Sequence, residues 1–285
     1  MNRDLRQRLA VAGVGVPLCA LAAYVGGPLL AVGLGLVAAG GMWEYASMME
    51  VAGTRVFGRS GAMAAFLFPT VVFYGGVPGG AFYGGALLMG FAAVSIATVR
   101  LEDRPLIAAA VTAFGVLYLG GLLSFGIPLR EGWLGGPRVL RIDTDERLAR
   151  TLFFFFPIVI TWVADTAAYF GGRAFGRHRL APMISPNKTV EGAVAAMLAA
   201  TLVAPIYSRW ILPGGWEFSM AIAVAFGLAV GAFAIVGDLV ESALKRECGV
   251  KDASNLLPGH GGLLDRLDSL LWALPTAFFF TVLFK

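Results

Sequence analysis

Polar and charged residues gather in the segment 242–269, which lies between two long apolar segments. It contains Lys-Arg at 245–246, Lys-Asp at 251–252, His260 among glycines, and Asp-Arg-Leu-Asp at 265–268. Only 14% of the whole chain is charged. Such a local density of cations, carboxylates and an imidazole in a hydrophobic chain indicates a site of chemistry.

Carboxylates lie at the ends of the two helices expected on either side of this loop. Asp238, Ser242 and Lys245 follow i, i+4, i+7 spacing and therefore share one helix face. Asp265 and Asp268 follow i, i+3 spacing at the start of the next helix. The two helices can bring the three Asp residues together. We predict a Mg²⁺ site at Asp238, Asp265 and Asp268, because Mg²⁺ prefers carboxylate and water oxygens.

The basic residues around these carboxylates suit a polyphosphate substrate that arrives with its metal. Attack on an α-phosphorus brings anions together, so it needs a divalent metal, cations on the phosphate oxygens and placement of the attacking group. The alternative is a solvated loop whose charges pair with one another, which fits Glu241 and Lys245. That alternative does not explain why so many charges gather at the ends of two apolar helices.

A second candidate is Asp165, which lies within an apolar segment. An ionisable residue at membrane depth is costly and is a functional candidate by default. Asp165, Tyr169 and Gly172 have i, i+4, i+7 spacing and share one helix face. The alternative is a carboxylate that only bridges helices through an Arg or a Tyr, and we favour function over it.

A third candidate is the polar segment 173–192. Ser185 and Pro186 suit a turn, and Thr189 suits the N-cap of the next helix. Taken alone, the segment is a helix start with flanking positive charges. It gains weight because it would face the loop 245–261 across the same membrane surface.

The elements that must position these residues are membrane-spanning helices. The chain has 285 residues, of which 58% are hydrophobic, and it contains repeated apolar runs long enough to cross a bilayer. The runs 193–204 and 221–236 do not alternate apolar and polar residues, which argues against a membrane β-barrel. We predict an all-α, polytopic integral membrane protein with about nine transmembrane helices. The candidate spans are residues 9–26, 28–49, 61–77, 79–99, 105–128, 151–172, 190–211, 217–244 and 262–284.

We expect one integral membrane domain over residues 1–285, with N-terminal helices in 1–128 and catalytic helices and cytoplasmic loops in 151–285. The glycine pairs 172/176 and 227/231 have the small-xxx-small spacing of close helix packing. Simple tolerance of glycine in membrane helices explains any single pair as well.

The distribution of basic residues predicts the orientation of the chain. With a cytoplasmic N-terminus, most of the 22 Lys and Arg residues fall on the cytoplasmic side. This orientation also places the polar loops 173–189 and 245–261 on the cytoplasmic face.

Several common site types are excluded by the sequence. Two Cys and two His residues provide no zinc-ligand spacing. The chain has no GxxxxGK[ST] run and no GxGxxG before a helix, which excludes the common soluble nucleotide-binding folds.

The segment from Ser242 to Asp268 resembles the signature of the phosphatidate cytidylyltransferase family, also called CDP-diacylglycerol synthases. Every position of that pattern is met. The matching residues are Ser242, Leu244, Lys245, Arg246, Lys251, Asp252, Ser254, Leu257, Pro258, His260, Gly261, Gly262, Leu263, Asp265, Arg266, Leu267 and Asp268. The segments 165–172 and 185–192 also resemble family motifs, so the specific part of the resemblance covers about the last 125 residues.

The resemblance implies an enzyme that converts CTP and phosphatidate to CDP-diacylglycerol and pyrophosphate. It implies a Mg²⁺ centre, which a monovalent cation such as K⁺ can accompany, and a homodimer that binds no nucleic acid. It also implies a multi-pass protein of the bacterial cytoplasmic (inner) membrane, with the lipid bilayer as its partner and a cytoplasmic active site.

The resemblance assigns roles to the motif residues of this chain. The catalytic group comprises Asp165, Lys188, Lys245, Arg246 and His260. The substrate-binding group comprises Tyr169, Ser185, Pro186, Asn187, Thr189, Ser242, Lys251, Asp252 and Arg266. Asp238, Asp265 and Asp268 are the metal ligands.

Two other functions are open at this point. A related lipid enzyme, such as a CDP-archaeol synthase or a polyprenol kinase, would use similar chemistry on another acceptor. A membrane transporter could use Asp165 and glycine-interrupted helices to line a path. Against the transporter, the charges cluster at one surface and no internal repeat is evident.

Overall fold

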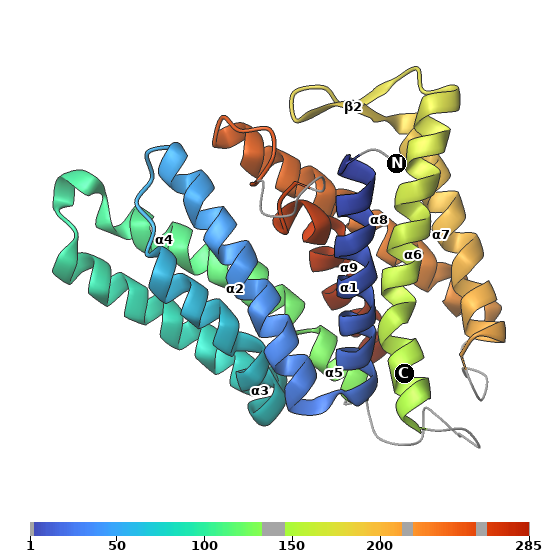
Figure 1. Ribbon diagram of the computed structural model, residues 1–285, viewed down its shortest axis with the longest axis horizontal. Coiled ribbons are helices and arrows are strands. Elements are labelled where there is room, and N and C mark those ends of the chain that lie inside the picture. Colours follow the sequence, from blue (N-terminus) through green and yellow to red (C-terminus); the bar gives the residue numbers. More distant parts are fainter. Residues whose placement is uncertain (1–2, 133–145, 213–218, 255–260, 285) are drawn as a thin grey trace. The chain divides into compact units, whose positions relative to one another are not determined.

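The computed structural model describes residues 3–132, 146–212, 219–254 and 261–284 (Figure 1). Its helices are α1 (Arg3–Val25), α2 (Gly27–Val51), α3 (Gly58–Thr98), α4 (Pro105–Val116), α5 (Gly126–Glu131), α6 (Glu146–Phe175), α7 (Val190–Trp210), α8 (Met220–Glu247) and α9 (Leu264–Leu283). A 3₁₀ turn, η1 (Leu101–Asp103), precedes α4, and a π-helical stretch, η2 (Leu117–Gly121), follows it. The predicted all-α fold class is confirmed but for one short hairpin, β1 (Arg179–Ala181) and β2 (Ser185–Thr189).

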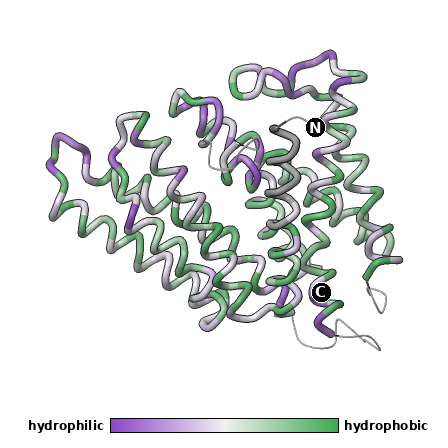
Figure 2. Tube along the Cα trace, in the orientation of Figure 1, coloured by the Kyte–Doolittle hydropathy of each residue, from purple (hydrophilic) through white to green (hydrophobic). Residues whose placement is uncertain are grey.

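Seven helices in the described part of the chain are long and apolar enough to cross a membrane. Figure 2 shows hydrophobic residues along their length and the most hydrophilic ones toward helix ends and connections. In α1 the section Gly15–Val25 forms a shorter apolar helix. The chain is a polytopic helical membrane protein, although the predicted count of nine spans is not confirmed.

Helix α3 is folded back on itself at Gly76. This residue has φ +67°, a left-handed conformation that only glycine adopts without strain. The two halves pack against each other, since the Tyr83 hydroxyl donates to the Ala64 carbonyl over 3.2 Å and the Phe68 and Tyr83 rings meet at 5.3 Å. The spans predicted separately at 61–77 and 79–99 correspond to these two halves.

The described chain divides into two compact units. The first comprises Met1–Ile127 and Leu244–Leu267, and the second comprises Pro128–Ala243 and Asp268–Lys285. Helices α8 and α9 each contribute residues to both units. The expectation of one membrane domain is not tested by this division and stays a prediction.

The first unit is built around α2, α3 and α4. Met42, Ala65 and Val116 are fully buried in its core. The Tyr45 hydroxyl on α2 donates to the Val111 carbonyl on α4 over 3.1 Å. Burial of these apolar side chains and satisfaction of the one polar tip hold the three helices together.

The second unit has an aromatic core between α6, α7 and α8. The ring of Phe156 stacks on Tyr207 at 4.9 Å and on Phe226 at 4.7 Å. Helices α7 and α8 also touch through small residues, because a Cβ on Gly227 would lie 2.3 Å from the Ala200 carbonyl oxygen and 2.7 Å from the Ala204 Cβ. The predicted close packing at the 227/231 glycine pair is therefore confirmed.

The Gly227 contact predicts the effect of a larger side chain. Gly227→Leu should lower the free energy of unfolding by about 2 kcal/mol, because it forces α7 and α8 apart. Thermal unfolding in detergent measures the change. Gly85→Leu is the matched control, since a Cβ at Gly85 meets nothing within 4 Å. Equal unfolding temperatures for the two variants would contradict the packing argument.

Candidate active site

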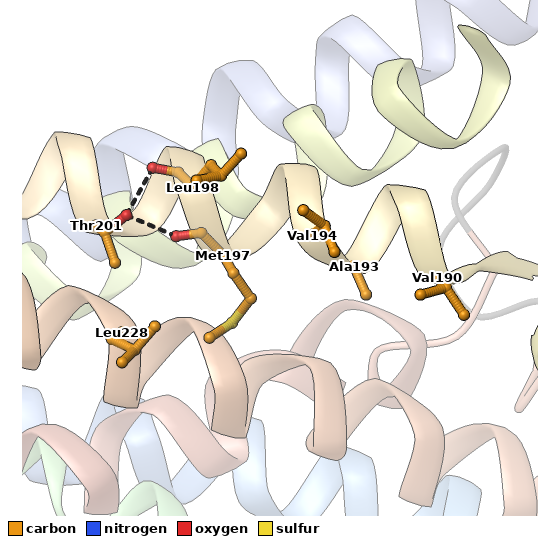
Figure 3. Close-up of a pocket in the computed structure, with 7 residues that line it drawn as sticks. All are labelled: Val190, Ala193, Val194, Met197, Leu198, Thr201 and Leu228. Atoms are coloured by element: carbon orange, nitrogen blue, oxygen red, sulfur yellow. Dashed lines mark hydrogen bonds between the residues drawn. The ribbon is translucent and has the colours of Figure 1, made fainter. Parts of the chain in front are cut away.

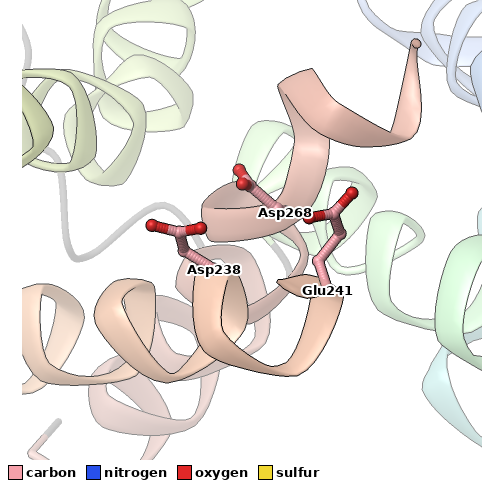
Figure 4. A group of neighbouring side chains, drawn as sticks. All are labelled: Asp238, Glu241 and Asp268. Carbon is pink, nitrogen blue, oxygen red and sulfur yellow. The ribbon is translucent and has the colours of Figure 1, made fainter. Parts of the chain in front are cut away.

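Three carboxylates from α8 and α9 meet in the second unit. One oxygen from each of Asp238, Glu241 and Asp268 lies within 4.8 Å of the others. Asp238 and Glu241 stand three residues apart on α8, and Figure 4 shows Asp268 facing them from α9. Glu241 is fully buried, whereas Asp238 and Asp268 are half-buried. This group can hold a cation.

The two helices approach closely enough for this because of Gly237. A Cβ at Gly237 would lie 2.5 Å from the Asp268 carbonyl oxygen and 2.7 Å from Cδ1 of Trp272. Any larger residue would separate the helix backbones at the level of the carboxylates. Phe233 and Trp272 stack at 6.2 Å one turn along the same contact, which fixes the rotation of the helices.

Lys188 supplies a cation to this group. It lies near the end of β2, and its Nζ forms an ion pair with Oδ2 of Asp238. Asp165, on α6, interacts electrostatically with both Asp238 and Lys188, and Asp268 interacts with the same two groups. Charged side chains from α6, β2, α8 and α9 of the second unit therefore gather at one place. Among the described residues, several carboxylates share this lysine, so a further cation would relieve their repulsion.

The β1–β2 hairpin carries Lys188 and is fastened to α7 by Glu191. The Glu191 carboxylate accepts the backbone N–H groups of Arg177 at 3.0 Å and His178 at 3.2 Å, and it lies 2.6 Å from Nδ1 of His178. The Thr189 hydroxyl accepts the N–H of Gly192 at 3.1 Å, so the predicted N-cap is confirmed. Lys188 is thus held immediately before a capped helix.

Asp265, predicted as the third metal ligand, makes different contacts in the first unit. Its Oδ1 lies 2.7 Å from Nζ of Lys245. Its Oδ2 accepts the N–H groups of Ala253 at 3.1 Å and Gly262 at 2.8 Å. Among the described residues Glu241 is the third carboxylate beside Asp238 and Asp268, and the assignment of Asp265 as a metal ligand stays a prediction. The i, i+3 spacing of Glu241 from Asp238 indicated that the two carboxylates share a helix face. The sequence was instead interpreted as a pair of Glu241 with Lys245.

The remaining predicted site residues are distributed over both units. Arg246 donates to the Val250 carbonyl at 3.1 Å, and Arg173 donates to the Tyr169 hydroxyl at 3.2 Å. Ser242 is buried on α8. Exposed positions are Tyr169, Pro186, Asn187, Arg246, Lys251, Asp252 and Arg266, while Ser185 on β2 is half-buried. His260 lies outside the described residues, and the roles assigned to all these residues stay predictions.

An apolar cavity of about 350 Å³ opens along α7 in the same unit (Figure 3). It begins at Val190, two residues after Lys188, and extends to Thr201. Its lining residues are Val190, Ala193, Val194, Met197, Leu198, Thr201 and Leu228. The hydroxyl of Thr201 donates to carbonyls of its own helix. The chemistry of this lining suits a hydrocarbon chain and does not suit a nucleotide.

Comparison with known proteins agrees with the motif resemblance. The family model described as "Cytidylyltransferase family" matches residues 6–284. The chain is similar to phosphatidate cytidylyltransferase of Haemophilus influenzae, with 39% identity over 168 residues, 56% of this chain and 58% of the relative. The corresponding protein of Bacillus subtilis is 44% identical over 134 residues, 47% of this chain and 48% of the relative. The matches thus span about half the length of these curated relatives.

The contacts of Glu191 predict that the hairpin depends on its charge. In Glu191→Gln an amide NH₂ would face backbone N–H groups, so the hairpin should open more often. Trypsin cleavage at Arg177, Arg179 or Lys188 in detergent should become about tenfold faster. Glu247→Gln, an exposed Glu at the end of α8, is the matched control. Unchanged cleavage in the Glu191 variant would show that the carboxylate does not hold the hairpin.

Proposed function

Because this chain belongs to the cytidylyltransferase family, we propose that it is a phosphatidate cytidylyltransferase. It would transfer CMP from CTP to phosphatidate, giving CDP-diacylglycerol and pyrophosphate. The observation that carries this proposal is the meeting of Asp238, Glu241 and Asp268 with Lys188, at the two helices that bear the family signature. The relatives named phosphatidate cytidylyltransferase support the same reaction.

In this reaction an oxygen of the phosphatidate phosphate attacks the α-phosphorus of CTP. The new bond is phosphorus–oxygen, the α–β bridge breaks, and pyrophosphate leaves with the electron pair. The attacking phosphate is already anionic, so no strong general base is needed. Positioning and charge stabilisation then dominate the barrier. Lys188 is suited to bind a phosphate oxygen, because its Nζ is a buried cation beside the carboxylates.

The carboxylate group fits a divalent cation. Asp238, Glu241 and Asp268 offer hard oxygen donors from two helices, which is the donor chemistry that Mg²⁺ takes. We propose that these three residues hold Mg²⁺, with Glu241 in the place first predicted for Asp265. Bound Mg²⁺ would neutralise triphosphate charge. The accompanying monovalent cation stays a prediction.

The setting of the site follows from the same family relationship. Apolar helices and bacterial relatives indicate a bacterial membrane protein. We further propose a homodimer in the inner membrane whose N-terminus and active site are cytoplasmic, as the basic residues predict. CTP would then arrive from the cytoplasm and the lipid phosphate from the bilayer, and the apolar cavity along α7 could receive an acyl chain.

A lipid-product assay tests the proposed reaction. Purified protein in detergent, given radiolabelled CTP, phosphatidate and Mg²⁺, should form labelled CDP-lipid and pyrophosphate, and chelation should abolish the product. Ether-lipid and polyprenol acceptors in parallel reactions separate the related lipid enzymes. Product from one of those acceptors and none from phosphatidate would overturn the proposal. Absence of any CDP-lipid, together with solute movement in vesicles, would favour a transporter.

The contacts of the two candidate third ligands predict different metal affinities. Glu241→Gln and Asp268→Asn should each weaken Mg²⁺ binding about tenfold or more, because each removes a charged oxygen donor. Asp265→Asn should leave the affinity within about twofold of the wild-type value, since its oxygens contact Lys245 and backbone N–H groups.

Isothermal titration calorimetry of each purified, folded variant measures these affinities. Glu102→Gln, at an exposed position in η1, is the control for loss of one negative charge. A tenfold loss in Asp265→Asn with wild-type binding in Glu241→Gln would restore the ligand set predicted from the sequence.

A further inference from the structure

A buried carboxylate in the first unit belongs to a helix that carries no part of the family signature. Glu44 on α2 is only 2% exposed. Its Oε1 accepts the Ser254 hydroxyl at 2.5 Å and the Leu263 N–H at 2.8 Å, and its Oε2 accepts the Leu264 N–H at 2.7 Å. Burying a charge costs several kcal/mol unless such bonds compensate it. The three donors all come from the signature segment.

Two of these donors lie at the N-terminus of α9. The first N–H groups of a helix lack partners within the helix, and the positive end of the helix dipole favours an anion there. Glu44 therefore acts as a cap supplied from a position about 220 residues away in the chain. The start of α9 is fixed to α2 by this carboxylate.

A second carboxylate binds the neighbouring backbone groups. Asp265 accepts the N–H groups of Ala253 and Gly262 and pairs with Lys245. Asp265 accepts hydrogen bonds from residues 253 and 262, and Glu44 accepts them from the adjacent residues 254, 263 and 264. Together they bind backbone and side-chain donors at residues 253–254 and 262–264.

The closeness of Glu44 also explains a glycine of the signature. A Cβ at Gly262 would lie 2.9 Å from Oε2 of Glu44 and 3.0 Å from both the Ala253 Cβ and the Ser254 nitrogen. The preceding Gly261 has φ +79°, which disfavours any other residue. The signature backbone is thus shaped to receive a carboxylate from α2.

We propose that Glu44 is a positioning residue for the reaction. It fixes the start of α9 at Leu263 and Leu264, immediately before Asp265, which pairs with Lys245. This inference rests on the proposed cytidylyltransferase function. Glu44 would touch no substrate and would act through the groups that it holds.

Two measurements on Glu44→Gln test this role, with Glu50→Gln as the matched control on an exposed position of the same helix. Hydrogen–deuterium exchange in detergent should be about tenfold faster at Leu263 and Leu264 and unchanged in α4, because an amide replaces one carboxylate acceptor with a donor. The kcat for CDP-lipid formation, normalised to folded protein, should fall about tenfold or more while the KM for CTP changes less than about threefold.

A role in stability alone would lower the folded fraction but leave kcat per folded molecule unchanged, and that result would overturn the inference. Unchanged exchange at Leu263 and Leu264 would overturn it as well. If Glu44→Gln does not fold, Ser254→Ala removes one of the three bonds, and about threefold lower kcat with faster exchange is expected. Wild-type exchange and wild-type kcat in that variant would count against the inference.

Failure of the proposed function gives a different result. A wild-type protein that forms no CDP-lipid overturns that function and the catalytic part of the inference with it. The exchange comparison between Glu44→Gln and Glu50→Gln needs no substrate. It therefore decides separately whether Glu44 holds the signature segment.

Discussion

Burial of carboxylates among apolar helices is the constraint on which the rest of this protein depends. A buried anion is tolerated only where donors or cations surround it. Glu44 is compensated by three hydrogen bonds, Asp265 by Lys245 and two backbone N–H groups, and Asp238 by Lys188. Each compensation joins segments distant in sequence. Compensation of buried carboxylates therefore both places the charged groups of the signature and orders its backbone.

Small residues make these electrostatic contacts possible. Helices that approach through side chains of ordinary size remain 8–10 Å apart. At Gly237 the backbones of α8 and α9 come into contact, and carboxylate oxygens of Asp238 and Asp268 lie within 4.8 Å of each other. At Gly262 the absence of a side chain admits the carboxylate of Glu44. At these two positions the lack of a side chain lets charged residues approach a neighbouring backbone, in addition to the general use of glycine in packing membrane helices.

Local features of this chain could be predicted from its sequence, and contacts between distant segments could not. The Thr189 cap joins residues three positions apart, and the meeting of Asp238 with Asp268 was predicted because α8 and α9 follow one another along the chain. The spacing of Asp265 from Asp268 gives only a rough shared face, and it did not reveal that the Asp265 oxygens contact Lys245 and the N–H groups of Ala253 and Gly262. Residues 179–189 were expected to form a loop, because the sequence shows turn residues there. The structure pairs them as a hairpin beside the bond from the Arg177 N–H to Glu191, which the sequence did not indicate.

The contacts of Glu44 give the N-terminal helices a structural role at a signature that lies near the other end of the chain. From the sequence, residues 1–128 were expected as N-terminal membrane helices, and the Trp43-Glu44 pair could serve packing as well as function. Yet the backbone around Gly262 cannot be understood without Glu44, because the closest atom to the missing Cβ of that glycine is the Glu44 oxygen. The signature thus contains catalytic groups and also a backbone that fits against α2. Gly262 of the signature is therefore explained by packing against Glu44 of α2, whereas its cations suit chemistry at the phosphates.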